Sequence, residues 1–262
     1  STILDEIADK TKERVEASKM KTPLKTLRDL AEKKSSKNSD GFIFEKKLSE
    51  PDMTYICEVK KASPSKGLIE PDFHPVEIAK EYETAGAGAI SVLTEPDYFL
   101  GSLSYLEDIR ANVSIPLLRK DFTVDEYMIY EAKLLGASAI LLIVSILDSA
   151  QLKRYLDLAH DLGLSAIVET HDADEIQTAI DVGAGIIGVN NRNLADFTVD
   201  IENSVNLRGL VDDNILFISE SGIKTKEDVG RLKENNVDAV LIGETLMKSD
   251  DKKSMILELK MG

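Results

Sequence analysis

Gly86-Ala-Gly-Ala-Ile90 and Gly136-Ala-Ser-Ala-Ile140 are two copies of a five-residue pattern that recurs along the chain. Three further copies begin at Gly163, Gly183 and Asn236. Glycine, and less often asparagine, adopts the left-handed conformation that ends a helix, and the small residues after it lead into a short β-branched run. Each copy therefore predicts the end of a helix followed at once by the start of a strand.

Wide intervals follow the copies at Gly86 and Gly183, and each leaves room for one more strand. Apolar runs fill both intervals, Ser114-Ile-Pro-Leu-Leu118 in the first and Asn214-Ile-Leu-Phe-Ile218 in the second. A further run, Met53-Thr-Tyr-Ile-Cys57, precedes the series. The repeated pattern and these three runs together predict eight strands.

The order and number of these units indicate the fold class. Eight strands, each followed by a helical pattern, in 262 residues match a closed (β/α)8 barrel, the TIM barrel. The competing α/β fold is an open doubly wound sheet, but no Gly-x-Gly-x-x-Gly motif follows the first strand. We therefore predict the barrel, and we expect its chemistry where the strands end.

The first 50 residues stand outside the repeat. We expect one domain over residues 1–262, with an N-terminal helical extension (1–50), the barrel (51–248) and a C-terminal tail (249–262). Apolar stripes before and after Pro23 predict two amphipathic helices in the extension. These helices either plug one end of the barrel or help to cover a substrate. Residues 33–40 are expected to form a solvated linker.

The composition limits the compartment and the partners. The chain carries 47 acidic and 32 basic side chains, a net charge of −15, which argues against nucleic acid or an anionic membrane as the partner. An anionic substrate would need local positive charge. Cys57 is the single cysteine, and the sequence holds neither a secretion signal nor a membrane-spanning stretch. We expect a cytoplasmic protein and favour a monomer.

Polar residues gather where the expected strands end. In chain order they are Glu58, Lys60, Thr94, Lys120, Ser145, Glu169, Asn190, Arg192, Glu220, Ser221 and Gly243. Alternate side chains of a strand face the same way, so Glu58 and Lys60 both point into the barrel mouth if either does. Lysines and glutamates held close together shift each other's pKa values and support general acid and base catalysis. The alternative is a structural ion-pair network that closes the top of the barrel.

Lys120 follows Arg119 at the end of an apolar strand. Neighbouring side chains of a strand point to opposite faces, so one of the two cations faces the site. We predict that Lys120 does so and that Arg119 forms an outer ion pair. Lys120 would then be either a general acid or a Schiff-base nucleophile, and the spacing does not separate these roles.

The last two strands are followed by segments that favour a phosphate site. Ser219-Glu-Ser-Gly222 and Ile242-Gly-Glu-Thr245 stand where barrels often bind phosphate on backbone N–H groups. Gly222 and Gly243 would let the anion approach the main chain, although both could be ordinary turn residues. The carboxylate of Glu244 would repel a phosphate unless its side chain points away.

Two further segments bear on substrate binding. Lys60-Lys-Ala-Ser-Pro-Ser-Lys-Gly67 follows the first strand with three cations and two hydroxyl groups, and we interpret it as a mobile flap that contacts an anion. Phe99 and Phe122 follow the second and third strands. They either pack under loops or hold a flat ring.

A metal or redox centre is not indicated. His74, His160 and His171 are scattered, Cys57 is alone, and no spacing resembles a set of metal ligands. We therefore expect chemistry without a metal or a cofactor.

Seven segments in the same order resemble the indole-3-glycerol phosphate synthase family. They are Glu58-Val-Lys-Lys-Ala-Ser-Pro-Ser65, Ser91-Val-Leu-Thr-Glu95 with Tyr98-Phe-Leu-Gly-Ser102, Leu118-Arg-Lys-Asp-Phe122, Ile167-Val-Glu169, Ile187-Gly-Val-Asn-Asn-Arg-Asn-Leu194, Ile218-Ser-Glu-Ser-Gly222 and Leu241-Ile-Gly-Glu-Thr-Leu-Met247. The similarity runs from near residue 3 to about residue 248. Nothing in composition or periodicity names a substrate; the resemblance does.

The resemblance implies a lyase of tryptophan biosynthesis that uses neither metal nor cofactor. It would close the ring of 1-(2-carboxyphenylamino)-1-deoxyribulose 5-phosphate to give indole-3-glycerol phosphate, carbon dioxide and water. Lys120 would be the general acid, Glu169 and Lys60 would serve the later proton transfers, and Glu58 would orient the lysines. The remaining implied positions are Asn190, Glu220 and Ser221 for holding the intermediate, Ser63, Arg192, Gly222 and Gly243 for the anion, and Phe99 and Phe122 for the aromatic ring.

The chain departs from the family pattern at Lys66, which stands between Ser65 and Gly67 where some members run straight from serine to glycine, and at Glu244, where others carry a small residue. These departures concern the flap and the phosphate site. Three other functions stay open: a class I aldolase acting through Lys120, a phosphoribosylanthranilate isomerase, and a catalytically silent barrel that binds an anion or a protein.

Overall fold

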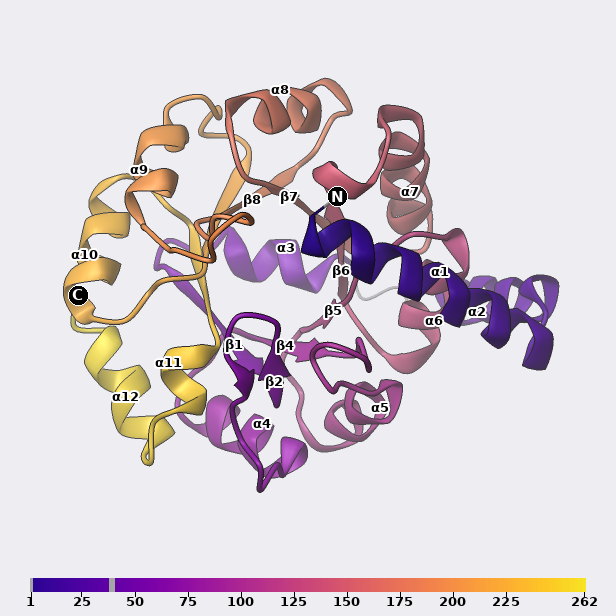
Figure 1. The fold of residues 1–262 in the computed structure, drawn as a ribbon, viewed down its shortest axis with the longest axis horizontal. Coiled ribbons are helices and arrows are strands. Elements are labelled where there is room, and N and C mark those ends of the chain that lie inside the picture. The colour runs from indigo at the N-terminus through magenta and orange to yellow at the C-terminus, as the bar shows by residue number, and fades with distance from the viewer. Residues whose placement is uncertain (1, 38–40) are drawn as a thin grey trace.

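The computed structural model describes residues 2–37 and 41–262. Its parallel strands close into a barrel with the order β1-β10-β9-β8-β7-β6-β5-β4 (Figure 1). The barrel strands are β1 (Thr54–Val59), β4 (Ala89–Leu93), β5 (Leu117–Lys120), β6 (Ala139–Ile143), β7 (Ser165–Thr170), β8 (Ile186–Asn190), β9 (Leu216–Glu220) and β10 (Ala239–Ile242). Because β1 pairs with both β4 and β10, the ring is closed. The predicted (β/α)8 barrel is confirmed, and the open sheet is excluded.

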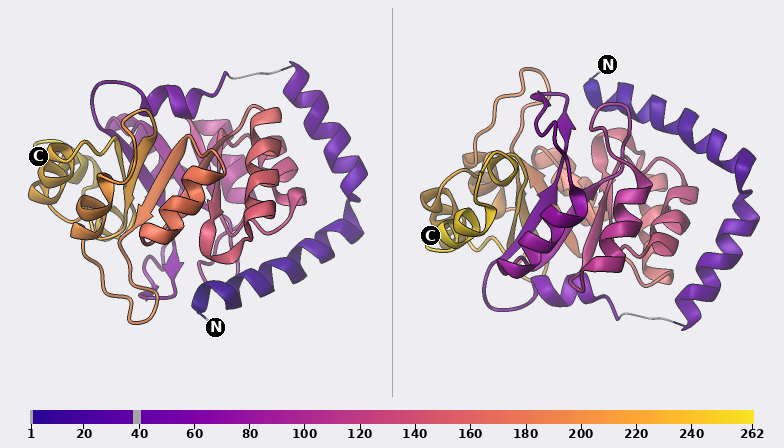
Figure 2. Two further views of the ribbon diagram at one scale, coloured as in Figure 1. Left: turned by 90° about the horizontal axis from the view of Figure 1, so that it is seen from above. Right: turned by 90° about the horizontal axis from the view of Figure 1, so that it is seen from below.

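Helices surround the barrel and cover its outer face (Figures 1 and 2). They are α4 (Pro75–Thr84), α5 (Leu103–Asn112), α6 (Glu126–Leu135), α7 (Ser149–Asp161), α8 (Ala173–Asp181), α9 (Glu202–Arg208), α10 (Lys226–Glu234) and α12 (Lys252–Leu259), with the short η1 (Val144–Ile146) and α11 (Glu244–Met247). Asp125, Asp148, Asp172 and Thr225 cap four of these helices by accepting hydrogen bonds from the first turn. The C-terminal segment 249–262 contains α12, whose Ile256 is buried, so this segment belongs to the helical layer.

The repeated pattern ends helices as predicted. Its first residue has a positive φ in all five copies: 95° at Gly86, 93° at Gly136, 76° at Gly163, 86° at Gly183 and 59° at Asn236. In each case a barrel strand begins two or three residues later.

The three strands predicted from apolar runs start later than the runs: β1 by one residue, β9 by two residues, at Leu216, and β5 by three residues. β5 begins at Leu117 and not at Ser114, because Pro116 has no N–H to offer the parallel ladder. Only the Pro116 carbonyl takes part, accepting a hydrogen bond from the backbone N–H of Ile90.

Alternate residues of the strands face the barrel interior, where an apolar layer lies beneath a polar one. Four pairs of residues, each two positions apart on one strand, show this: Ile56 and Glu58, Leu118 and Lys120, Ile167 and Glu169, Ile218 and Glu220. The first member of each pair is fully buried in the interior core. The polar members therefore project together at the C-terminal end of the barrel.

The N-terminal extension forms the two predicted helices, α1 (Ile3–Lys21) and α2 (Leu24–Lys37). They meet at an angle beside the barrel, with the start of α1 at one end of it (Figure 2). The predicted linker is wrong for residues 33–37, which continue α2, and residues 38–40 lie outside the described residues. Lys34 fixes this last part of α2 against the barrel, because its Nζ donates hydrogen bonds to the carbonyls of Lys133 and Leu134 at the end of α6.

A third helix, α3 (Ile43–Leu48), closes the opposite end of the barrel. Its Phe44 and Leu48 are buried in the interior core with Ala89 and Ala139, which begin their strands. The plug that the sequence assigned to the first two helices is therefore α3, and α1 lies at the end that carries the polar residues.

Candidate active site

A cavity of ≈ 680 Å³ opens at the C-terminal end of the strands. Every residue to which the family resemblance assigns a role lines it: Glu58, Lys60, Ser63, Phe99, Lys120, Phe122, Glu169, Asn190, Arg192, Glu220, Ser221, Gly222 and Gly243. Thr94 and Ser145, which the sequence analysis also placed at strand ends, follow β4 and β6 and do not line the cavity. The closure of the barrel brings the lining residues together from β1, β5, β7, β8, β9 and β10.

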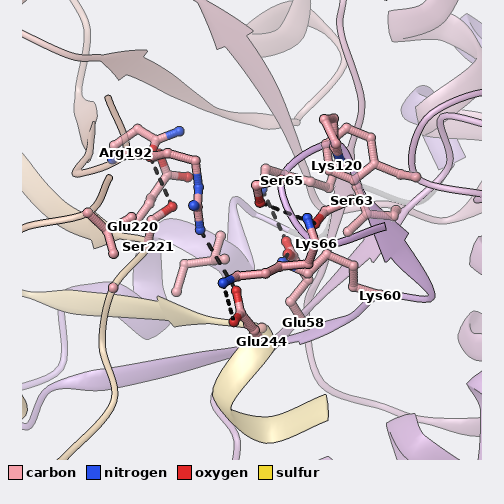
Figure 3. Close-up of a pocket in the computed structure, with 18 of the residues that line it drawn as sticks. Glu58, Lys60, Ser63, Ser65, Lys66, Lys120, Arg192, Glu220, Ser221 and Glu244 are labelled. Atoms are coloured by element: carbon pink, nitrogen blue, oxygen red, sulfur yellow. Dashed lines mark hydrogen bonds and ion pairs between the residues drawn. The ribbon is translucent and has the colours of Figure 1, made fainter. Parts of the chain in front are cut away.

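Glu58 joins the two lysines at the base of the cavity (Figure 3). Its Oε2 accepts hydrogen bonds from Lys120 Nζ (3.1 Å) and Ser91 Oγ (2.8 Å), and its Oε1 lies 3.5 Å from Lys60 Nζ. The Arg119 side chain turns to the outer face and pairs with Asp121 and Glu131, as the alternation of the strand predicted. Lys120 is therefore the cation of β5 that enters the site.

The two lysines respond differently to burial. Burial disfavours the ammonium of Lys120, but the negative charges of Glu58, Glu220 and Glu169 outweigh it and hold the pKa of Lys120 well above its usual value. For Lys60, burial outweighs the attraction of Glu58 and the pKa is lowered. Burial likewise opposes ionisation of Glu58, yet Lys120 and Lys60 keep the pKa of this carboxyl below its usual range. Lys120 is thus a firmly held ammonium, and Lys60 gives up its proton more readily.

Glu169 and Glu220 lie close to each other and to Lys120. Both side chains are buried, and neither carboxylate oxygen of Glu220 has a hydrogen-bond partner within residues 2–37 and 41–262. Burial and the charge of Glu169 raise the pKa of Glu220 well above its usual value. Loss of the proton from Glu220 is therefore disfavoured by burial and by the neighbouring carboxyl group of Glu169.

Asn190, Ser221 and Gly222 form one wall through a strained turn. Asn190 Oδ1 accepts hydrogen bonds from Ser221 Oγ (2.9 Å) and from the Arg192 backbone N–H (3.0 Å). Ser221 and Gly222 have φ values of 72° and 80°, so a non-glycine residue occupies the left-handed region directly after β9. Such strain is typical of functional turns that the surrounding structure holds in place.

Gly243 allows Glu58 and Lys60 to lie against the end of β10. A Cβ atom at this position would come within 2.9 Å of Glu58 Oε1 and 3.2 Å of Lys60 Nζ. The glycine therefore has a steric function in the site and is not an ordinary turn residue.

Cations surround Glu244 at the rim of the cavity (Figure 3). Its Oε1 lies 2.8 Å from Lys248 Nζ and 3.7 Å from Lys66 Nζ, and its Oε2 lies 3.9 Å from Arg192 Nη2. The carboxylate lies among the predicted anion-binding residues. It therefore does not have the outward orientation that would spare a bound phosphate from repulsion.

The flap that follows β1 is a small antiparallel hairpin, β2 (Ala62–Ser63) with β3 (Gly67–Leu68). Ser63 Oγ accepts the backbone N–H of Lys66 within its turn. The hairpin thereby presents Lys66 over the rim of the cavity.

An apolar wall faces these charges. The rings of Phe99 and Phe122 lie 5.9 Å apart between centroids with an interplanar angle of 39°. Ile3, Leu4 and Ile7 of α1 line the same cavity. This surface can hold a flat ring. The position of α1 beside the cavity favours the second of the two roles expected for the N-terminal helices, that of helping to cover a substrate.

Sequence reasoning missed the residues that fix the site from behind. Asp121 follows Lys120 and is buried, where it accepts from both terminal nitrogens of Arg14 (2.9 and 3.2 Å), and it also contacts Arg119. Ser91 supports Glu58 from β4. The only signal in the sequence was their position, since a polar residue inside or directly after an apolar strand requires a partner.

In the part of the chain that the structure describes, the histidines and carboxylates do not gather into a metal site. Within the described residues no group of three or more His, Cys, Asp or Glu side chains could hold a metal ion. Nor does any helix in residues 2–37 or 41–262 have the length and apolar character that crossing a membrane requires.

The fold and the site define a (β/α)8-barrel protein whose cavity holds a cluster of buried lysines and glutamates and a rim of cations. The chain belongs to the indole-3-glycerol phosphate synthase family, whose family profile, "Indole-3-glycerol phosphate synthase", matches residues 4–259. Proteins of that name are similar along their whole length. The one from Ruminiclostridium cellulolyticum is 53% identical over 98% of both chains, and the one from Endomicrobium trichonymphae is 54% identical over 98% of this chain and 99% of its own.

Solved structures of other proteins share the fold. 3-Hexulose-6-phosphate synthase from Salmonella typhimurium matches with a TM-score of 0.66 at 13% identity, over 80% of this chain and 97% of its own. Thiamine phosphate pyrophosphorylase from Pyrococcus furiosus matches with a TM-score of 0.59 at 16% identity, over 83% of this chain and 96% of its own. At these identities the likeness concerns the barrel alone.

Proposed function

We propose that this chain is an indole-3-glycerol phosphate synthase, a carboxy-lyase of tryptophan biosynthesis. Its substrate is 1-(2-carboxyphenylamino)-1-deoxyribulose 5-phosphate, which loses carbon dioxide and water on ring closure. The observation that carries the proposal is the contact of Glu58 with both Lys60 and Lys120. This group of charges lies in a cavity that has an apolar wall on one side and cations at its rim. These three parts match the carbonyl, aryl and phosphate groups of the substrate. The full-length similarity to proteins of this name supports the same reaction.

Lys120 is assigned to the first step. The aromatic carbon that bears the carboxylate attacks the substrate's carbonyl carbon, and Lys120 gives a proton to the carbonyl oxygen as negative charge develops on it. The carboxylate then leaves as carbon dioxide, and its bonding electrons restore the aromatic ring. Glu58 keeps Lys120 in the ammonium form that this step requires.

Dehydration needs an acid and a base. The former carbonyl oxygen is now a hydroxyl group, which leaves as water after it accepts a proton, while a neighbouring carbon loses one. The lowered pKa of Lys60 suits it to donate to the leaving hydroxyl. Glu169 is then the base, and Glu220 holds the intermediate with Asn190 and Ser221.

The ends of the substrate are assigned to the two sides of the cavity. Phe99 and Phe122 hold the aryl ring. The phosphate lies at the opposite rim, where Ser63, Arg192, Gly222 and Gly243 line the cavity.

The aldolase alternative needs a different state of Lys120. A Schiff base forms from the neutral amine, whereas Glu58, Glu169 and Glu220 all favour the ammonium. The geometry therefore supports proton transfer by Lys120. We further propose that the protein is a cytoplasmic monomer without a metal or cofactor, with this phosphorylated small molecule as its partner; the acidic charge and the single buried cysteine support that assignment.

The proposed reaction can be followed directly, because the product is an indole and the chain contains no tryptophan. Mixing the protein with the carboxyphenylamino ribulose phosphate should give indole fluorescence that grows with time. Absence of the signal contradicts the proposed function. Loss of activity after borohydride treatment, with a covalent adduct on Lys120, would favour the aldolase instead.

A further inference from the structure

Glu244 is an acid where the proposed substrate brings its phosphate. Its side chain is one-quarter exposed and lines the cavity, beside the cations Lys66, Arg192 and Lys248. These partners come from separate parts of the fold, since Lys66 belongs to the turn of the β2–β3 hairpin and Arg192 follows β8. A carboxylate held there competes with any anion for the same positive charges.

The contacts of Glu244 are unequal in a way that bears on this competition. The short one, 2.8 Å, is to Lys248, which is 55% exposed and lies one turn further along the chain. The contacts with Lys66 and Arg192 are 3.7 and 3.9 Å, at the outer limit of an ion pair. The carboxylate can therefore exchange its two inner partners for an incoming anion and keep its outer one.

Glu244 is also firmly ionised. Burial opposes ionisation, but the hydrogen bond and charge of Lys248 and the charges of Lys66 and Lys60 outweigh it and hold the pKa below its usual range. Its negative charge is therefore present throughout the neutral pH range.

We propose that Glu244 is a built-in counter-ion of the phosphate site, which neutralises Lys66 and Arg192 while the site is empty and turns toward Lys248 when a phosphate dianion takes its place. The identity of the phosphorylated molecule rests on the proposed function, whereas the displacement itself does not. The residue sets a threshold for binding, because an anion must attract the two cations more strongly than the resident carboxylate does. A phosphate dianion meets this condition better than a singly charged anion.

Titration with inorganic phosphate tests the proposal without any turnover. The variant is Glu244→Gln, which keeps the size of the side chain and removes its charge. The matched control is Glu258→Gln, an exposed residue of α12 that changes the net charge of the protein equally. We expect Glu244→Gln to bind inorganic phosphate about tenfold more tightly than the wild type by calorimetry, the scale of one like charge removed from a partly exposed site. Glu258→Gln should bind as the wild type does.

Other outcomes overturn the proposal. Equal or weaker phosphate binding by Glu244→Gln would show that the carboxylate does not occupy the place of the anion. An equal gain in Glu258→Gln would assign the effect to net charge, and failure of both the wild type and Glu244→Gln to bind phosphate would show that the cations form no phosphate site.

Lys248→Gln provides a second test, because Lys248 is expected to act through Glu244. The weakening of phosphate binding by Lys248→Gln should shrink when Glu244→Gln is already present, and an undiminished effect contradicts the displacement. A wild-type protein that binds phosphate with this pattern but does not form indole would contradict the proposed function and leave the counter-ion role intact.

Discussion

Replacing Glu58 by glutamine removes the charge that joins Lys60 and Lys120 and leaves the shape of the side chain. Both lysines then lie in a largely buried site without their shared counter-ion. For a charge pair 3.5 Å apart, Coulomb's law with an effective dielectric constant of about 20 to 40 gives about 2 to 5 kcal/mol. Partial exposure to water reduces this value, so we expect the pKa of each lysine to fall by at least about one unit.

Because the pKa values of the lysines are expected to fall, the assay is the dependence of kcat on pH. In the proposed mechanism both lysines donate protons and must be protonated. Lower pKa values would therefore bring the loss of activity at high pH down to a lower pH. The dependence of kcat on pH should therefore show its basic limb shifted to lower pH by at least about one unit in Glu58→Gln, with kcat at neutral pH reduced about a hundredfold or more. Glu258→Gln is again the control. A basic limb at the wild-type position would refute the role of Glu58 as the counter-ion of the lysines.

Three further changes probe the surroundings of the site. The raised pKa of Glu220 means that its contribution to the free energy of unfolding falls as the pH rises. The free energy of unfolding of Glu220→Gln, measured with urea, should therefore gain about 1 kcal/mol or more relative to the wild type between pH 5 and pH 8. An equal difference between the two proteins at both pH values would contradict this. Gly243→Ala should lower kcat about tenfold with little change in melting temperature, because its Cβ would displace the Glu58 carboxylate that positions Lys120; wild-type kcat would show that the site tolerates the methyl group. Arg14→Gln breaks a two-point ion pair with buried Asp121, which anchors α1. The free energy of unfolding in urea should fall by about 2 kcal/mol, and KM should rise. Unchanged stability would count against that anchor.

The fold was predictable because the barrel repeats one local event. A residue able to adopt a positive φ ends each marked helix and the next strand follows at once, so the units could be counted from residues such as Gly136 and Gly183. The position of the site followed as well, since period-two alternation places Glu58 above Ile56 and Glu220 above Ile218. Local rules of this kind need no knowledge of the rest of the chain.

The pairing of charges was not predictable, because it depends on which strands the closed barrel makes neighbours. β1 and β5 are both neighbours of β4, and this arrangement lets Ser91 and Lys120 reach the same carboxylate. Similarly, Arg14 and Asp121 are far apart in sequence, and neither carries a local signal of the other. The orientation of the Glu244 side chain could not be predicted either, because the cations around it come from three separate segments.

The central claim is that Lys120 donates the proton that allows ring closure. Its most direct test is the rate of indole fluorescence from Lys120→Ala in a single turnover, with enzyme in excess over the carboxyphenylamino ribulose phosphate and with melting temperature measured in parallel. We expect a rate at least about a hundredfold below that of the wild type in a protein that melts at nearly the same temperature. A Lys120→Ala protein that closes the ring at close to the wild-type rate would contradict the claim.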